Sequence, residues 1–156
     1  MAKGYPQISE DKLSYTFDLR ENVFFSDEHP MTAEDVLFSM KVIKNPRVLA
    51  PHLRNYYSAV IDVFVEDDGR VTFVCDEPYF RNDVSLGFFE IIPKHFYVPE
   101  GLLDPVAISS LIDGSWETGL HRERVERFAD QFNQDFNRKV LGSGPYRVDD
   151  VERDVV

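Results

Sequence analysis

The sequence predicts an α+β fold, in which a small mixed β-sheet packs against amphipathic helices. Apolar and polar side chains alternate over residues 14–20 and again over 60–75, as they do in strands that bury one face. Residues 32–44 and 121–133 instead carry apolar side chains at helical spacing. We expect a sheet built from these strands and a further strand near residue 146, with both helices packed against it.

The first strand and the first helix are the most clearly marked elements. In the strand, Tyr15, Phe17 and Leu19 alternate with polar residues. The helix has a start signal, because Thr32 can cap it and Asp35, three residues later, can complete an Asp variant of the capping box. Its apolar stripe consists of Val36, Leu37, Met40 and Ile43.

A β-hairpin follows this helix after an irregular stretch. Asn45-Pro46 ends the helix, since the residue before a proline is disfavoured in the α conformation, and residues 46–58 show no regular pattern. The strands of the hairpin flank a turn at Asp67-Asp68-Gly69. Cys75, in the second strand, is expected to be a buried and inert thiol. The aromatic stretch 79–92 ends in a short apolar run whose structure, helix or strand, stays open.

Two helices are expected in the last third of the chain. A short one covers residues 104–112, with Asp104 as its cap and Pro105 at its first position. A longer one covers residues 121–133. Its charged face carries opposite charges four residues apart, in the pairs Arg122 with Glu126 and Glu123 with Arg127. Trp116, in the loop between the helices, is expected to pack onto its own domain.

The chain is large enough for one domain with its own core. It has 156 residues, of which 43% are hydrophobic, so a globular domain is expected rather than a disordered chain. The side chains expected in the core are Phe17, Leu19, Val36, Met40, Val63, Phe73, Phe128 and Phe132.

The charge of the chain argues against two classes of partner. Its formal net charge of −11 repels nucleic acid phosphates and anionic lipid headgroups, so we expect neither. The sequence has no apolar run of about eighteen residues, so a membrane-spanning helix is not expected. Met1-Ala2-Lys3-Gly4 leads directly into polar sequence without a secretory signal.

The residue patterns of catalytic and metal sites are not found. The four histidines, His29, His52, His95 and His121, are far apart and form no His-x-x-x-His pair, so neither a metal site nor a cofactor is expected. Gly142-Ser143-Gly144 lacks the Gly-x-Ser-x-Gly spacing of a nucleophile elbow and is interpreted as a tight turn.

Three strings of the sequence resemble one protein family. The first combines a Tyr-Thr-Phe-x-Leu-Arg strand from Tyr15, a turn at Ser26-Asp27, and the helix sequence Thr-Ala-Glu-Asp-Val-x-Phe-Ser over residues 32–39. The second is Pro93-Lys94-His95, and the third is Phe-Asn followed by Gly-Ser-Gly-Pro-Tyr over residues 136–146. They are similar to the bacterial extracellular solute-binding proteins, family 5, the oligopeptide-, dipeptide- and nickel-binding components of ABC importers. One departure is the turn, where the family usually has a glycine and this chain has Glu28.

The resemblance implies a subdomain of a type II periplasmic-binding-protein fold. It implies that residues 1–156 are one domain of a larger two-lobed protein, with about 14–140 as the accessory subdomain of the first lobe and 141–156 returning towards the main lobe. It further implies a non-catalytic function, the binding of a peptide or similar solute for ABC permease subunits. The place implied is the periplasm or the cell exterior, at the membrane through the transporter. In the family, an aromatic near the ligand comes from the region of Tyr56 and Tyr57, which are therefore the candidate ligand-binding residues.

Two alternatives to ligand binding stay open at this point. In the first alternative, the domain is a structural or interaction subdomain without direct solute contact. In the second, it is a small serine hydrolase that uses Ser143 or the region of His95. The cargo also stays open among peptides, nickel, haem and oligosaccharides, because most specificity residues are implied to lie outside this region.

Overall fold

The computed structural model describes residues 1–66, 69–97, 100–136 and 139–144, and it has the expected α+β architecture. Its sheet has four strands, β1 (Gln7–Ile8), β2 (Ser14–Asp18), β3 (Val60–Val65) and β4 (Arg70–Cys75), in the order β1-β2-β4-β3. All described pairings are antiparallel. The parallel part of a mixed sheet is therefore not among the described strands, and the strand expected near residue 146 lies outside the described residues.

One face of the sheet is apolar because of its register. Tyr15 lies opposite Phe73, Phe17 opposite Val71, and Val63 also opposite Phe73. Since side chains alternate along a strand, these residues point to the same face. They form the first hydrophobic core with α1 (Ala33–Lys44), which packs against this face. The opposite face carries polar pairs such as Thr16 and Thr72, whose hydroxyls are hydrogen-bonded at 2.8 Å.

The predicted capping box at the start of α1 is present. The Asp35 carboxylate accepts hydrogen bonds from the Thr32 backbone N–H (2.8 Å) and from the Thr32 hydroxyl (3.1 Å). Its other oxygen accepts from the backbone N–H of Lys94 at 2.8 Å. Asp35 is buried, and these bonds satisfy a carboxylate that would otherwise be costly to bury. The cap thus also ties α1 to α4 (Lys94–Tyr97).

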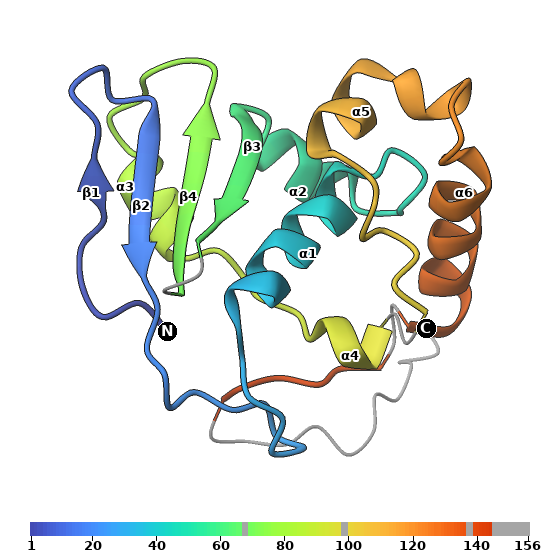
Figure 1. Cartoon of the computed structure of the whole chain (residues 1–156), viewed down its shortest axis with the longest axis horizontal. Coiled ribbons are helices and arrows are strands. Elements are labelled where there is room, and N and C mark those ends of the chain that lie inside the picture. Colours follow the sequence, from blue (N-terminus) through green and yellow to red (C-terminus); the bar gives the residue numbers. More distant parts are fainter. Residues whose placement is uncertain (67–68, 98–99, 137–138, 145–156) are drawn as a thin grey trace, which may run out of the picture.

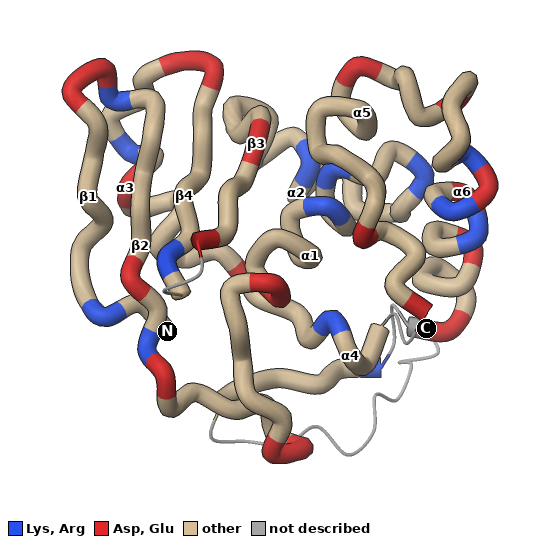
Figure 2. The backbone as a smooth tube through the Cα atoms, viewed as in Figure 1, with Lys and Arg blue, Asp and Glu red and all other residues tan. Residues whose placement is uncertain are grey.

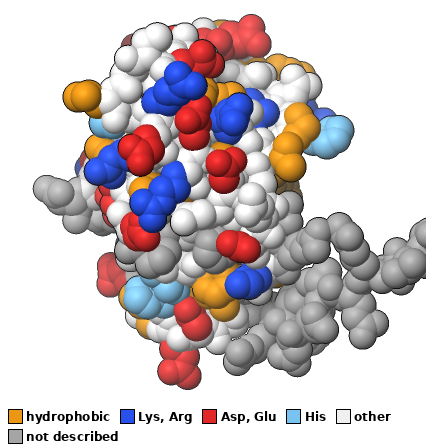
Figure 3. All heavy atoms as spheres, turned by 90° about the vertical axis from the view of Figure 1, so that its right-hand side faces the viewer, with side chains coloured by type: hydrophobic (Ala, Val, Ile, Leu, Met, Phe, Trp, Pro, Cys, Tyr) orange, Lys and Arg blue, Asp and Glu red, His pale blue; other side chains and the backbone are white. Residues whose placement is uncertain are grey.

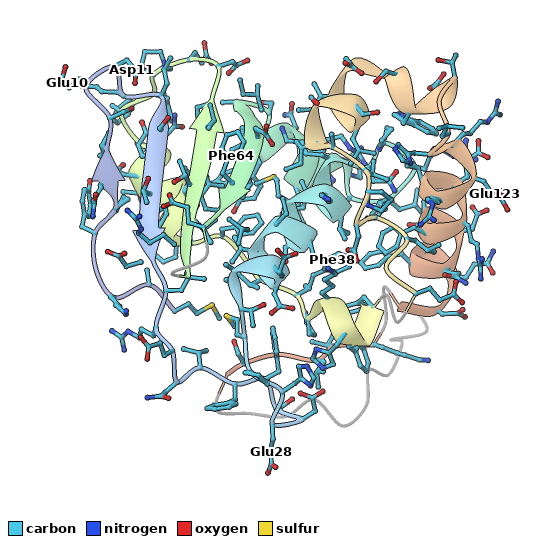
Figure 4. All side chains as sticks on the ribbon, in the orientation of Figure 1. Glu10, Asp11, Glu28, Phe38, Phe64 and Glu123 are labelled. Carbon is cyan, nitrogen blue, oxygen red and sulfur yellow. The ribbon has the colours of Figure 1, made fainter. Side chains whose placement is uncertain are left out.

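A second hydrophobic core lies on the other side of α1. Figure 1 shows the sheet on one side of α1 and the helices α5 (Ile108–Asp113) and α6 (Arg122–Gln131) on the other. Phe38 of α1 points towards α6 (Figure 4), where its ring meets that of Phe128 edge-to-face at 5.9 Å. Trp116 in the short helix η1 (Ser115–Glu117) is buried in this core, which confirms that it packs onto its own domain.

Several elements differ from the expectation. Residues 46–58 are not irregular throughout, because they contain α2 (Pro51–Tyr56). The open stretch 79–92 contains α3 (Asn82–Gly87) and no strand among its residues. The short helix begins at Ile108 rather than at 104, so the prediction of Asp104 as its cap was wrong. The physical reason is that the Asp104 carboxylate is engaged by Lys94 at 2.7 Å.

The remaining expectations are largely confirmed. The hairpin is confirmed, although Asp67-Asp68 are outside the described residues. The helix expected over 121–133 is present as α6, which continues into a π-helix that was not predicted, η2 (Phe132–Phe136). The expected core residues are buried except Leu19 and Phe132, which are half-buried against the cores. Arg122 pairs with Glu126 (3.1 Å), but Arg127 pairs with Glu100 (2.8 Å) instead of Glu123. No helix in the described part of the chain is long and apolar enough to cross a membrane.

Candidate functional site

The two candidate ligand-binding tyrosines lie at the end of α2 and face different environments. Tyr56 is the last residue of the helix and is 63% exposed, whereas Tyr57 is 7% exposed. Their rings meet edge-to-face at 4.9 Å. Consecutive residues near a helix end point in directions about 100° apart, so only one of the two reaches the core. The structure therefore separates the pair into a core residue and a surface residue.

Tyr57 is held in the first core from several sides. Its ring packs edge-to-face on Phe89 at 5.2 Å. Its carbonyl oxygen accepts a hydrogen bond from Lys44 Nζ at 2.7 Å, and that of Ser58 accepts from the same ammonium group at 3.2 Å. Burial raises the pKa of Tyr57 to about 12, mainly through the loss of solvation. The Tyr57 ring is thus anchored in the first core, and Tyr57 also forms part of the walls of two surface hollows that Tyr56 lines.

Tyr56 stands between two hollows of the surface. An apolar groove of about 370 Å³ lies on one side, and its walls include Val42, Val48, Leu53, Phe88 and Phe132. A polar hollow of about 480 Å³ lies on the other side, and its walls include Glu77, Tyr79, Arg81, Asn82 and Ser85. The Tyr56 hydroxyl donates to Ser85 Oγ at 3.3 Å, which links α2 to α3. One aromatic ring thus adjoins an apolar site and a polar site.

Side-chain hydrogen bonds hold the loop that leads into α2 in place. Arg54 Nη2 donates to the carbonyl oxygens of Asn45 (2.7 Å) and Val48 (2.6 Å). Asn133 accepts from the Leu49 backbone N–H and donates to the Arg47 carbonyl oxygen, both at 2.9 Å. These bonds join the wall of the groove to η2 across the molecule. A site held in this way needs little reorganisation when a ligand arrives.

A cluster of titratable side chains, Asp27, His29 and His95, joins two of the family-like strings. His95 Nε2 and Asp27 Oδ2 lie 2.7 Å apart, and the His29 ring stacks on that of His95 at 3.8 Å. The hydrogen bond with His95 lowers the pKa of Asp27. Glu28 occupies the usual glycine position with a φ of 68°, and it points into solvent at the tip of the turn (Figure 4). The turn therefore keeps a left-handed residue although the glycine is replaced.

The residues considered above for catalytic or metal chemistry are Ser143, Cys75 and the four histidines. Among the described residues, no group of three or more His, Cys, Asp or Glu side chains could hold a metal ion. Ser143 lies in a bend beside Gly142, whose carbonyl oxygen accepts from the Ser26 backbone N–H at 2.9 Å. Cys75 is buried, and this burial raises its pKa to about 11, which keeps it protonated and unreactive.

The sequence singled out Tyr56 as a candidate and gave little indication of its surroundings. The groove walls include Leu53 in α2, which was not predicted, and Phe88 beside α3, in a stretch whose structure was left open. The exposed apolar residues of 79–92 were the available signal, because an apolar run with two possible structures can also present side chains to a ligand. The contact of Asp27 with His95 spans 68 positions and had no local signal.

Known proteins place this chain in a family of binding proteins. The family model "Bacterial extracellular solute-binding proteins, family 5 Middle" matches residues 1–156. The chain is similar to the "Probable peptide-binding protein YejA" of Agrobacterium fabrum, with 29% identity over 151 residues, which cover 95% of this chain and 20% of that protein. It thus spans about a fifth of that curated relative.

Two solved structures share the fold. The ABC transporter substrate binding protein CtaP of Listeria monocytogenes has a TM-score of 0.61 and 26% identity, over 97% of this chain and 25% of that one. NikZ of Campylobacter jejuni in complex with Ni(L-His) has a TM-score of 0.62 and 21% identity, over 97% and 24% of the two chains. The family model confirms the resemblance seen in the strings, and the two structures confirm the fold. The chain belongs to the bacterial extracellular solute-binding proteins, family 5, and matches the middle region of that family.

Proposed function

We propose that this chain is the middle part of the substrate-binding protein of an ABC importer, and that the cargo is a peptide. The family supports the solute-binding function, and the name of the Agrobacterium relative supports a peptide cargo. In this proposal residues of about 14–140 form the accessory subdomain of the first lobe, and 141–156 return to the main lobe. The protein works in the periplasm or outside the cell and reaches the membrane through the permease subunits.

The observation that carries the proposal is the pair of hollows beside Tyr56. A peptide has apolar side chains and a polar backbone at alternating positions, and it needs both kinds of surface side by side. The apolar groove accepts a side chain, while Arg81 and Ser85 in the polar hollow offer donors to carbonyl oxygens or to a carboxylate. The exposed Tyr56 ring separates the two and packs on the ligand between them.

The mechanism that follows is non-covalent. One lobe presents this wall, the other lobe closes over the peptide, and water leaves the enclosed site. Closure requires ligand contacts that the open form lacks, since a ligand shifts a two-state equilibrium only by its differential affinity. The 156-residue chain alone leaves most of a peptide in water, and we expect it to bind peptides more weakly than about 1 mM.

The test uses the parent protein and a panel of short peptides in calorimetry. Tyr56→Ala should weaken binding by about 1–2 kcal/mol, or roughly 5- to 30-fold, because an aromatic anchor is lost. Tyr5→Ala removes a tyrosine that is 73% exposed near the N-terminus, and it serves as the matched control that leaves affinity unchanged. Tyr57→Ala should instead lower the melting temperature, because its ring lies in the core.

A structural role without solute contact is the second candidate, and the burial of Tyr57 favours it. If Tyr56→Ala binds peptides as tightly as the parent, the domain is a scaffold and the hollows are not subsites. If the parent binds no peptide but another solute of the family, the cargo assignment is wrong while the solute-binding function stands.

A further inference from the structure

The apolar groove beside Tyr56 has one charged side chain among the described residues that form its walls, that of Glu90. Apart from Ser39, the other walls are aliphatic or aromatic. The Ser39 hydroxyl is already engaged, because it donates to the backbone carbonyl oxygen of Asp35 at 2.6 Å and accepts from the Ile92 backbone N–H at 2.9 Å. Glu90 is therefore the charged group that this groove presents to a ligand.

The carboxylate of Glu90 has no partner in the part of the chain that the structure describes, neither an ion pair nor a side-chain hydrogen bond. Carboxylates elsewhere on the surface do have partners. Figure 3 shows interleaved basic and acidic side chains on the side of α6. There Arg122 pairs with Glu126 at 3.1 Å, and Arg127 pairs with Glu100 at 2.8 Å. The charge of Glu90 is thus open to a cation that a ligand supplies.

The inner wall of the groove adds a second open polar group, the hydroxyl of Tyr57. This side chain is 7% exposed, and its hydroxyl has no hydrogen-bond partner among the described residues. Burial raises the pKa of Tyr57 to about 12, and the neighbouring Tyr56 and the negative charge of Glu90 add to this rise. The Glu90 carboxylate therefore lies within electrostatic reach of the hydroxyl. A neutral hydroxyl can accept a hydrogen bond from an ammonium or guanidinium group.

Three aromatic rings in the walls also suit a cation. Tyr56 and Phe88 are exposed, and Phe132 is half-buried. The face of an aromatic ring attracts an ammonium or guanidinium group. The aliphatic walls, such as Val48 and Leu53, suit an apolar stem instead. Lysine and arginine side chains combine such a stem with a cationic end.

The charge of the whole chain favours the same class of ligand. Its formal net charge is −11, and Figure 2 shows acidic residues spread over loops and helix ends in both halves of the molecule. A surface of this charge attracts cations and repels anions. The groove of about 370 Å³ is near the lower end of the range for small-molecule sites, roughly 300–1,000 Å³, which suits one side chain rather than a whole peptide.

We infer that the apolar groove beside Tyr56 binds a lysine or arginine side chain of the ligand, and that Glu90 holds its cationic end. This inference rests on the proposal that the cargo is a peptide, and it names the kind of residue that the peptide carries. An acidic side chain in the groove would face the like charge of Glu90, and a purely apolar one would leave that carboxylate without a partner.

The first test uses the 156-residue chain and two small probes in NMR titrations. N-acetyl-lysinamide has an apolar stem and an ammonium group, whereas N-acetyl-norleucinamide has a similar stem without the charge. The methyl resonances of Val48 and Leu53 report on the groove. We expect the lysine probe to shift them with a Kd at least about tenfold lower than that of the norleucine probe. Salt at about 0.5 M should reduce this difference, because it screens the ion pair.

The variant Glu90→Gln removes the charge and keeps the size of the side chain. Its affinities for the two probes should agree within about threefold. The matched control is Glu123→Gln on α6, since Glu123 is exposed, has no ion pair in the described part of the chain, and points away from the molecule (Figure 4). This control should keep the preference for lysine, and melting curves show that each variant is folded. Equal shifts by both probes in the wild type, or a lysine preference that survives Glu90→Gln, would overturn the inference.

Calorimetry on the parent protein separates this inference from the proposed function. The peptides are short alanine peptides with a lysine or a norleucine at one position, and each position is tried in turn. A lysine preference that disappears in Glu90→Gln supports both proposals. Peptide binding without a lysine preference at any position refutes the inference and leaves the peptide cargo standing. A parent that binds none of the peptides refutes the cargo, and the probe titrations then decide the inference.

Discussion

Phe73 belongs to the first core, and its removal tests the packing of the sheet. The residue is 3% exposed on the central strand β4. It lies opposite Tyr15 on one side and Val63 on the other. Its ring meets Phe17 at 5.9 Å and Phe89 at 5.6 Å, both near edge-to-face. Phe73→Ala leaves a cavity between two strands and the segment after α3, and the paired strands prevent these neighbours from closing it.

We therefore expect Phe73→Ala to lower the free energy of unfolding by about 3–5 kcal/mol, the range for a buried phenylalanine. Urea titrations followed by circular dichroism measure this loss, and an unchanged m-value shows that the change is one of stability. The matched control is Phe64→Ala on the neighbouring strand β3, where the ring is 54% exposed (Figure 4). This variant should lose less than about 1 kcal/mol. A loss below about 1 kcal/mol for Phe73→Ala, or equal losses for both variants, would refute the packing described.

Four further predictions concern local features. Glu28→Gly should raise the unfolding free energy by about 0.5–1 kcal/mol, because Glu28 has a left-handed φ of 68°, and a loss in urea titration would contradict this. Thr32→Ala should cost about 1 kcal/mol in the same assay through loss of its contact with Asp35, with Thr32→Ser near wild type. Cys75 should resist alkylation at pH 8 until urea unfolds the chain, since its pKa is raised to about 11, and rapid native-state labelling would show exposure. Burial lowers the pKa of Lys44 from 10.5 to about 8, so the unfolded chain holds the proton more tightly and stability rises with pH between these values. The unfolding free energy of Lys44→Met should lack that rise, and parallel pH curves for the two proteins would disprove it.

The elements that could be predicted are those whose signals are local. The sheet hairpin, α1 and α6 each bury one face, so their alternation or helical spacing is visible in the sequence. The helix α2 was missed because none of its residues is buried, and an apolar stripe is therefore absent. The helix α3 was ambiguous for the opposite reason, since it carries apolar residues on both sides.

Contacts between distant residues account for the other differences. Asp104 has the local features of a helix cap, yet its carboxylate pairs with Lys94 at 2.7 Å, and the helix starts at Ile108. Which of Tyr56 and Tyr57 is buried could not be predicted locally either. It is decided by Phe89, because the ring that meets Phe89 is the one that enters the core.

The family-like strings contact one another in the folded structure, although they are far apart in the sequence. The turn at Ser26-Asp27 and the corner at His95 are separated in sequence, and the carboxylate of Asp27 meets the His95 ring at 2.7 Å. The backbone N–H of Lys94, next to His95, donates to Asp35 in the helix string at 2.8 Å. Two of the strings thus meet at the start of α1, where they fix the turn, the cap and α4 to one another. The Asp27 carboxylate contacts the His95 imidazole, and this contact does not involve the side chain of Glu28. Glu28 can therefore replace the usual glycine without breaking the junction. The replacement costs local backbone strain, because Glu28 has a left-handed φ.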